Sequence, residues 1–99
     1  MTTDHRLNAK GQAERLLGML RNDPNAQQLQ ALAAECESLT SAIGAFHIEA
    51  IRFRMFNVDR LLSRGGLPVP AGSAEIFADV RRELEAAGFH TRSHAAPSS

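Results

Sequence analysis

The sequence predicts an all-α fold: a helical hairpin with one very long central helix and a short third helix, completed as a bundle by dimerisation. The dominant residues (alanine, leucine, arginine, glutamine and glutamate) favour helix. Apolar residues recur at steps of three and four, and no long stretch alternates apolar with polar residues. The only strand-like segment, 67–70, holds two prolines and is expected to be a connector. The 99 residues suffice for one helical domain, expected over 1–89, followed by a disordered tail over 90–99.

The first helix is expected to begin at Thr3 or Asp4, whose side-chain oxygen can accept a hydrogen bond from a free amide of the first turn. It should end near Asn22, because the following Asp23-Pro24 pair is typical of the start of a new helix. Its apolar residues fall on one face by their spacing: Leu7, Ala13, Leu16, Leu17 and Leu20.

The second helix is expected to run from Pro24 to Arg64, where the Gly65-Gly66 pair stops it. At about 1.5 Å per residue it would be about 60 Å long. Steps of three and four alternate along it for more than three heptads, which is typical of a helix that packs along another helix. This seam consists of Leu29, Leu32, Cys36, Leu39, Ile43, Phe46, Ala50 and Phe53.

The distal half of this helix carries two apolar faces. Phe53 and Phe56 lie outside a second stripe formed by Ile51, Met55, Val58 and Leu62. One neighbouring helix cannot cover both faces, and a large exposed apolar patch is rare in a monomer. We therefore expect two copies to pack their long helices together about a two-fold axis. The alternative is a break at Gly44 that folds the chain into a compact four-helix monomer.

The third helix is expected to begin at Ser73, which can act as its cap, with Glu75 in the first turn where the helix dipole favours a carboxylate. Gly88 should end it, and Phe89 would then pack on Leu84 in a Schellman motif. The apolar face of this helix consists of Ile76, Phe77, Val80 and Leu84.

Charge is balanced overall but not along the chain. Eleven basic and eleven acidic residues exclude a basic nucleic-acid arm, a polybasic membrane anchor and an acidic tail. Residues 24–50 carry only acidic charges, whereas residues 51–66 carry four arginines and one aspartate, so antiparallel copies would bring unlike charges together. With no apolar run of 18 residues and no signal-peptide core, we expect a cytoplasmic protein without a membrane partner.

No motif indicates catalysis, a cofactor or a metal site. The single cysteine excludes an internal disulfide and a multi-thiolate zinc site. Cys36 and His47 would lie about 16 Å apart on one helix, so they could share a metal only with ligands from a partner chain. His90 and His94 have helical ligand spacing but fall in the expected tail. The chain also lacks the motifs of serine hydrolases, P-loops and zincins, and we expect no enzyme.

The predicted function is a small non-catalytic interaction, regulatory or assembly protein that acts as a homodimer, with a protein client as a further partner. The predicted interface consists of Leu29, Leu32, Cys36, Leu39, Ile43, Phe46, Phe53 and Phe56. The alternative is a dimeric nucleic-acid-binding transcriptional regulator, because arginine binds phosphate through two parallel hydrogen bonds. Its arginine surface would consist of Arg52, Arg54, Arg60, Arg64, Arg81 and Arg82.

The short–long–short helix layout, together with the stretch 11–23, resembles the CsoR/RcnR class of metal-responsive repressors. That class uses a cysteine shortly after this stretch and a His-x-x-x-Cys pair late in the second helix. This chain has Ala26, Ile51 and Met55 at those places, so no metal function is carried over. The resemblance implies only a small helical regulator.

Overall fold

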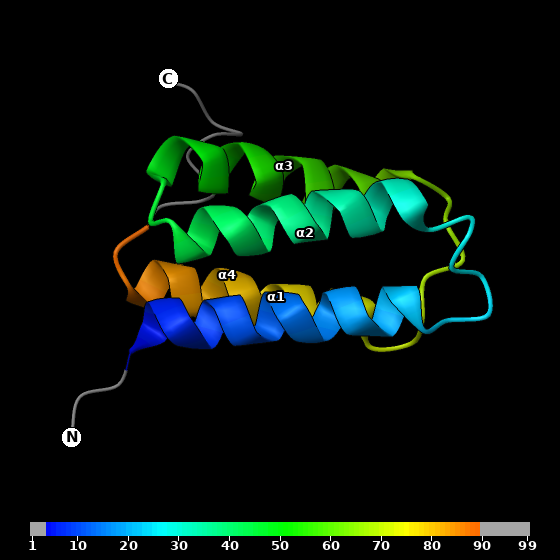
Figure 1. The fold of residues 1–99 in the computed structure, drawn as a ribbon, viewed down its shortest axis with the longest axis horizontal. Coiled ribbons are helices and arrows are strands. Elements are labelled where there is room, and N and C mark those ends of the chain that lie inside the picture. The colour runs from blue at the N-terminus through cyan, green and yellow to red at the C-terminus, as the bar shows by residue number, and fades with distance from the viewer. Residues whose placement is uncertain (1–3, 90–99) are drawn as a thin grey trace.

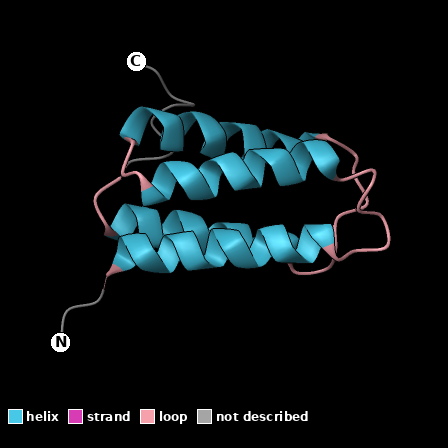
Figure 2. Ribbon diagram, in the orientation of Figure 1, coloured by secondary structure: helices cyan, strands magenta, loops and turns pink. Residues whose placement is uncertain are grey.

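The computed structural model describes residues 4–89 and confirms an all-helical chain. It contains four helices within that range: α1 (His5–Arg21), α2 (Gln30–Gly44), α3 (Ile48–Arg64) and α4 (Ser73–Ala86) (Figure 1). The described residues include no strand, and loops join the helices at both ends of the bundle (Figure 2). The predicted tail over 90–99, His90 and His94 within it, and the capping candidate Thr3 all lie outside the described residues.

The helices form two layers, with α2 beside α3 and α1 beside α4 (Figure 1). The closest packing joins α1 to α4, α1 to α2 and α2 to α3, whereas α3 and α4 touch only sparsely. One apolar core fills the space between the layers. Its largest fully buried side chains come from all four helices and the turn before α2: Leu16, Leu20, Leu29, Leu32, Leu39, Ile43, Ile51, Met55, Val58, Val80 and Leu84.

The predicted bounds of the first helix are confirmed. The Asp4 carboxylate accepts a hydrogen bond from the Leu7 amide at 3.0 Å, and Asn22 is the C-terminal cap residue. Residues spaced three and four apart on one face are buried, as an amphipathic helix requires: Ala9, Ala13, Leu16 and Leu20.

The start of the second helix differs from the prediction. The Asp23 side chain accepts a hydrogen bond from the Asn25 amide at 2.8 Å, which folds a turn instead of capping a helix that begins at Pro24. Turns continue to Leu29, and α2 begins only at Gln30. Leu29 is fully buried at this point, so the loop carries the chain across the bundle end and delivers an apolar side chain to the core.

The single long helix from Pro24 to Arg64 is not confirmed, because α2 ends at Gly44 and α3 begins at Ile48. Phe46 adopts the left-handed conformation with φ +59°, which ends α2. His47 then caps α3 by accepting a hydrogen bond from the Ala50 amide on its Nδ1 atom at 3.2 Å. The break turns α3 back along α2, so the buried residues of both helices share one core, whereas Phe46 and Phe53 of the predicted seam stay exposed. The short–long–short layout behind the resemblance to the CsoR/RcnR class is therefore absent from the described chain.

The Arg6 side chain of α1 supports this break from a distance in sequence. Its Nη1 atom donates hydrogen bonds to the carbonyl oxygens of Ile43 and Gly44 at 3.0 and 3.3 Å. Carbonyl groups in the last turn of a helix have no partner within the helix and carry its partial negative charge. A guanidinium placed on them stabilises a helix that stops here.

The C-terminal end of α4 is confirmed in detail, and α4 begins at Ser73 as expected, but its cap residue differs from the prediction. Gly72 is the N-terminal cap residue, and the hydroxyl of Ser73 donates to the Pro70 carbonyl at 2.7 Å. At the other end Gly88 has φ +100°, and the Phe89 amide donates to the Leu84 carbonyl at 2.9 Å. This is the predicted Schellman motif, and Phe89 is buried.

Candidate functional site

Five large apolar residues of the described chain remain exposed: Leu7, Phe46, Ile48, Phe53 and Phe56. Three of them belong to the predicted interface. Phe46 is 59% exposed, Phe53 48% and Phe56 41%. A helix at the surface of a folded protein normally turns such rings toward the core. These side chains therefore mark the surface where the fold leaves apolar area uncovered.

Phe53 and Phe56 lie on the side of α3 that faces away from the core. The buried face of the helix consists of Ile51, Met55 and Val58, and helical spacing places both phenylalanines across the axis from it. The Arg54 guanidinium carbon lies 5.0 Å from the centroid of the Phe53 ring, within the range of a cation–π contact.

The other five residues of the predicted interface lie inside the chain's own bundle. Each is at most 1% exposed, and together they form the α2 side of the core: Leu29, Leu32, Cys36, Leu39 and Ile43. Helices α1 and α3 of the same chain pack against α2. These side chains therefore have no surface left to offer to a second copy or to a client.

Polar bonds fix α3 against α2 beside the exposed phenylalanines. One carboxylate oxygen of Glu35 accepts hydrogen bonds from Arg54 Nη1 at 3.0 Å and from Asn57 Nδ2 at 3.1 Å. Asn57 is 8% exposed, and its side-chain amide donates its hydrogen bond to Glu35 on α2. The bonds set the register between the two helices, and they hold Arg54 next to the Phe53 ring.

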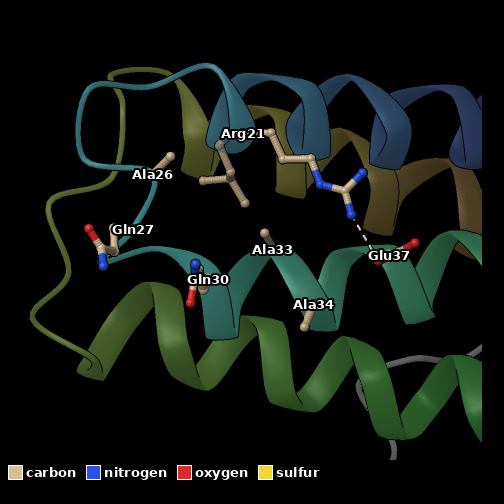
Figure 3. A pocket seen from close by; sticks show the side chains of 8 residues that line it. Arg21, Ala26, Gln27, Gln30, Ala33, Ala34 and Glu37 are labelled. Carbon is tan, nitrogen blue, oxygen red and sulfur yellow. Dashed lines mark hydrogen bonds and ion pairs between the residues drawn. The ribbon is translucent and has the colours of Figure 1, made fainter.

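Two shallow hollows extend along the outer face of α2. The first, of about 480 Å³, lies between α2 and the end of α1, where Arg21 forms a 2.8 Å ion pair with Glu37 across it (Figure 3). The second, of about 590 Å³, lies between α2 and α3 and is bordered by Arg54. Both hollows are lined by Ala34 and Glu37, so they adjoin each other. Small side chains from α2 and its C-terminal cap line the second hollow, together with Glu37: Ala34, Ser38, Ser41, Ala42 and Ala45.

The sequence analysis missed this hollow, although the signal is in the sequence. Ala34, Ser38, Ser41 and Ala45 are separated by four, three and four residues, which places them on one face of a helix opposite the leucine seam. A face of small residues at the same spacing predicts a surface that another helix can approach closely.

The six arginines of the alternative function come from two helices, four from α3 and two from α4. Arg60 and Arg64 are exposed on α3. Arg81 lies over the Phe77 ring at 5.2 Å and bridges α4 to α3. The ion pairs of the others are Arg52 with Glu49, Arg54 with Glu35, Arg81 with Asp59 and Arg82 with Asp79.

The candidate metal and nucleophile residues take structural places. Cys36 is fully buried, and burial together with the adjacent Glu35 carboxylate raises the pKa of its thiol to about 12. The thiol therefore stays protonated near neutral pH, a form that is a poor nucleophile and metal ligand. His47 is exposed and uses Nδ1 to cap α3. Within residues 4–89, no three His, Cys, Asp or Glu side chains lie close enough together to hold a metal ion.

A second polar cluster joins the start of α1 to the end of α4. His5 Nδ1 lies 2.6 Å from Glu83 Oε1, and the Asn8 amide donates to the same oxygen at 3.4 Å. The hydrogen bond from His5 is the main reason that the pKa of the Glu83 carboxyl group lies below its ordinary value of 4.5. This cluster stabilises the α1–α4 layer and is remote in sequence from the hollow.

These features define the chain as a small antiparallel four-helix protein with an aromatic and basic outer face on α3 beside a small-residue hollow on α2. Comparisons with models of protein families, with curated proteins and with solved structures each find no match to this chain. Across residues 4–89, no helix has both the length and the apolar character needed to cross a bilayer.

Proposed function

We propose that this chain is a small non-catalytic helical interaction protein that acts as a homodimer in a regulatory or assembly role. The observation that carries the proposal is the exposure of Phe53 and Phe56 on the outward side of α3. Fully burying a phenylalanine side chain contributes about 1.5–3 kcal/mol relative to leaving it in water. A partner surface that covers the exposed part of both rings recovers part of this energy.

A non-catalytic role is supported by the chemistry of the described residues. The Cys36 thiol is buried and protonated, and His47 is committed to capping a helix. Alanine and serine line much of the two hollows on α2, and Arg21 and Glu37 neutralise each other at the first hollow. Such a surface offers shape for packing instead of an activated group for a reaction.

The mass in solution tests the proposal. Light scattering after size exclusion, over a dilution series, is expected to give the mass of two chains for the natural protein. Replacing Phe53 and Phe56 by serine should reduce the mass to one chain and leave the helical circular dichroism spectrum unchanged. Leu7→Ser is the matched control, because Leu7 is exposed to a similar extent on α1. A natural protein with the mass of one chain at every concentration would contradict the homodimer.

Nucleic-acid binding is a second candidate, favoured by Arg60 and Arg64, which helical spacing places on the same side of α3 as the exposed Phe53 ring. Arginines contact phosphates and aromatic rings stack on bases, so the combination suits a nucleic-acid strand. The test is binding to a generic duplex and to a single strand at increasing salt. Binding that weakens steeply with salt and is lost in Arg60→Glu/Arg64→Glu, but not in Arg82→Glu, would support it. Absence of binding at low salt would exclude it.

A further inference from the structure

The side chains on the outer face of the bundle differ in size between α2 and α3. Apart from Glu37, the exposed α2 side chains that line the hollow are small, and Ala34 and Ser41 contribute no bulk that could fill it. On α3 the Phe53 ring projects outward, and Arg54 joins it to the edge of the hollow. A hole formed by small residues on one helix and a large side chain on the next are the two elements of knobs-into-holes packing.

The same two helices are opposite in charge. The α2 segment carries Glu35 and Glu37 and no basic residue. The α3 segment carries four arginines against Glu49 and Asp59. By total charge an α3 helix therefore complements an α2 helix and repels a second α3 helix, while Glu35 and Glu37 also form ion pairs with Arg54 and Arg21 of their own chain.

The position of Phe53 along the bundle also fits the hollow. Arg54 and Asn57 both bond Glu35, so this part of α3 lies beside Glu35 near the middle of α2. Phe53 adjoins Arg54 and is therefore level with the middle of α2, where Ser38 and Ser41 border the hollow. A two-fold axis running along the helices keeps this level. It places α3 of one copy over α2 of the other, antiparallel, as α3 lies beside α2 within one chain.

We infer that the hollow on α2 receives the Phe53 side chain of a second copy, so that two symmetric Phe53-in-hollow contacts join a dimer. This inference rests on the proposed homodimer and assigns its interface. A two-fold axis across the helices would instead place α2 on α2 and α3 on α3, which brings like charges and like shapes together. Side-chain size, helix charge and the position of Phe53 along the bundle therefore all favour the two-fold axis that runs parallel to the helices.

The test uses two variants that each remove one half of the contact. Ser41→Trp fills the hollow, and Phe53→Ser removes the ring; both positions are exposed, so each variant should fold. Each variant alone is expected to have the mass of one chain in light scattering. An equimolar mixture is expected to have the mass of two chains, because the first variant's Phe53 fits the second variant's open hollow. The introduced Trp side chain then lies opposite the serine that replaces Phe53.

Arg15→Trp is the control, because it adds the same indole to an exposed position on α1. It should dimerise like the natural protein. Ala34→Phe provides a second filled hollow if Ser41→Trp lowers the helical signal. A filled-hollow variant that stays dimeric, or a mixture that stays at the mass of one chain, would overturn the inference. Dimeric natural protein with dimeric filled-hollow variants would leave the proposed homodimer standing on another surface, whereas monomeric natural protein would remove both.

Discussion

Helices α2 and α4 end in the same way with different residues. At the end of α4 the Phe89 amide donates to the Leu84 carbonyl at 2.9 Å, and the Gly88 amide donates to Glu85 at 3.0 Å. At the end of α2 the corresponding bonds run from His47 to Ala42 at 3.0 Å and from Phe46 to Ile43 at 3.1 Å. The left-handed residue is Gly88 in one motif and Phe46 in the other. Only the glycine made its helix end visible in the sequence.

Tertiary contacts hold Phe46 in a conformation that its own side chain disfavours. A residue with a Cβ atom in the left-handed region costs about 1–2 kcal/mol. The Phe46 ring meets the Phe89 ring edge-on with centroids 5.4 Å apart, and the Arg6 guanidinium lies 5.4 Å from its centroid. Each partner comes from another helix end, so the two motifs touch. A helix end of this kind depends on residues about 40 positions away in the chain.

The difference between the ends of α2 and α4 reflects how far the sequence predicts the fold. Asp4, Asn22 and Gly88 act through local hydrogen bonds, so the bounds of α1 and the end of α4 could be derived. The start of α2 and the break after Gly44 could not. Asp23 and Pro24 satisfy a turn as well as a helix start, and Gly44 without a neighbouring proline is an ambiguous signal.

The candidate site, like the fold, could be derived from the sequence only in part. The exposure of Phe53 and Phe56 was derivable, because helical spacing alone separates them from Ile51 and Met55. The face of small residues on α2 was derivable from its spacing, but the volume of the hollow was not, because it depends on the angle at which α3 returns beside α2. The five buried seam residues were assigned to an interface because a straight second helix cannot bring α3 back to cover them.

The largest expected effect comes from truncating a core side chain in the last turns of each of these helices, α2 and α4. Ile43→Ala and Leu84→Ala each delete a fully buried side chain and leave a cavity. Each should lower the free energy of unfolding by about 2–5 kcal/mol, measured by urea denaturation. Similar losses at the two positions would show that the core supports both helix ends equally. A loss below 1 kcal/mol at Ile43 would contradict its place in the core.

Gly88→Ala should have the next largest effect. The backbone at Gly88 has φ +100°, and open space surrounds the position where a Cβ atom would lie. The change therefore causes no collision and tests backbone conformation alone, with an expected loss of about 1–2 kcal/mol. Gly11→Ala, in the middle of α1 with the same open surroundings, is the control and should stabilise the protein by up to about 1 kcal/mol. Equal effects at the two glycines would contradict the left-handed end of α4.

Two substitutions at Phe46 separate strain from contact. Phe46→Ala keeps the unfavourable conformation and loses the ring contacts with Phe89 and Arg6, which are worth about 0.5–1.5 kcal/mol for an aromatic pair. Phe46→Gly loses the same contacts but relieves the strain, so it should be more stable than Phe46→Ala by about 1 kcal/mol. Thermal and urea unfolding of the two variants measure this difference. If residue 46 were helical, as the predicted seam requires, Phe46→Ala would be the more stable of the two variants, because alanine is the better helix former.

Acid has the smallest expected effect, at the His5–Glu83 contact beside the α4 motif. The folded-state pKa of the Glu83 carboxyl group lies below its ordinary value of 4.5, chiefly because of the His5 hydrogen bond. Its contribution to stability is therefore complete above that value and disappears as the pH falls through the lowered folded-state pKa. Glu83→Gln should lower stability at pH 6 by an amount typical of a partly exposed pair, about 0–1 kcal/mol, and the gap from the natural protein should close as the pH falls through the lowered folded-state pKa of Glu83. Glu75→Gln is the control, since Glu75 is exposed and lies in the first turn of α4, at the other end of the helix from Glu83. Parallel pH profiles for the natural protein and Glu83→Gln would mean that the end of α4 is held by its backbone motif and core alone, without the carboxylate.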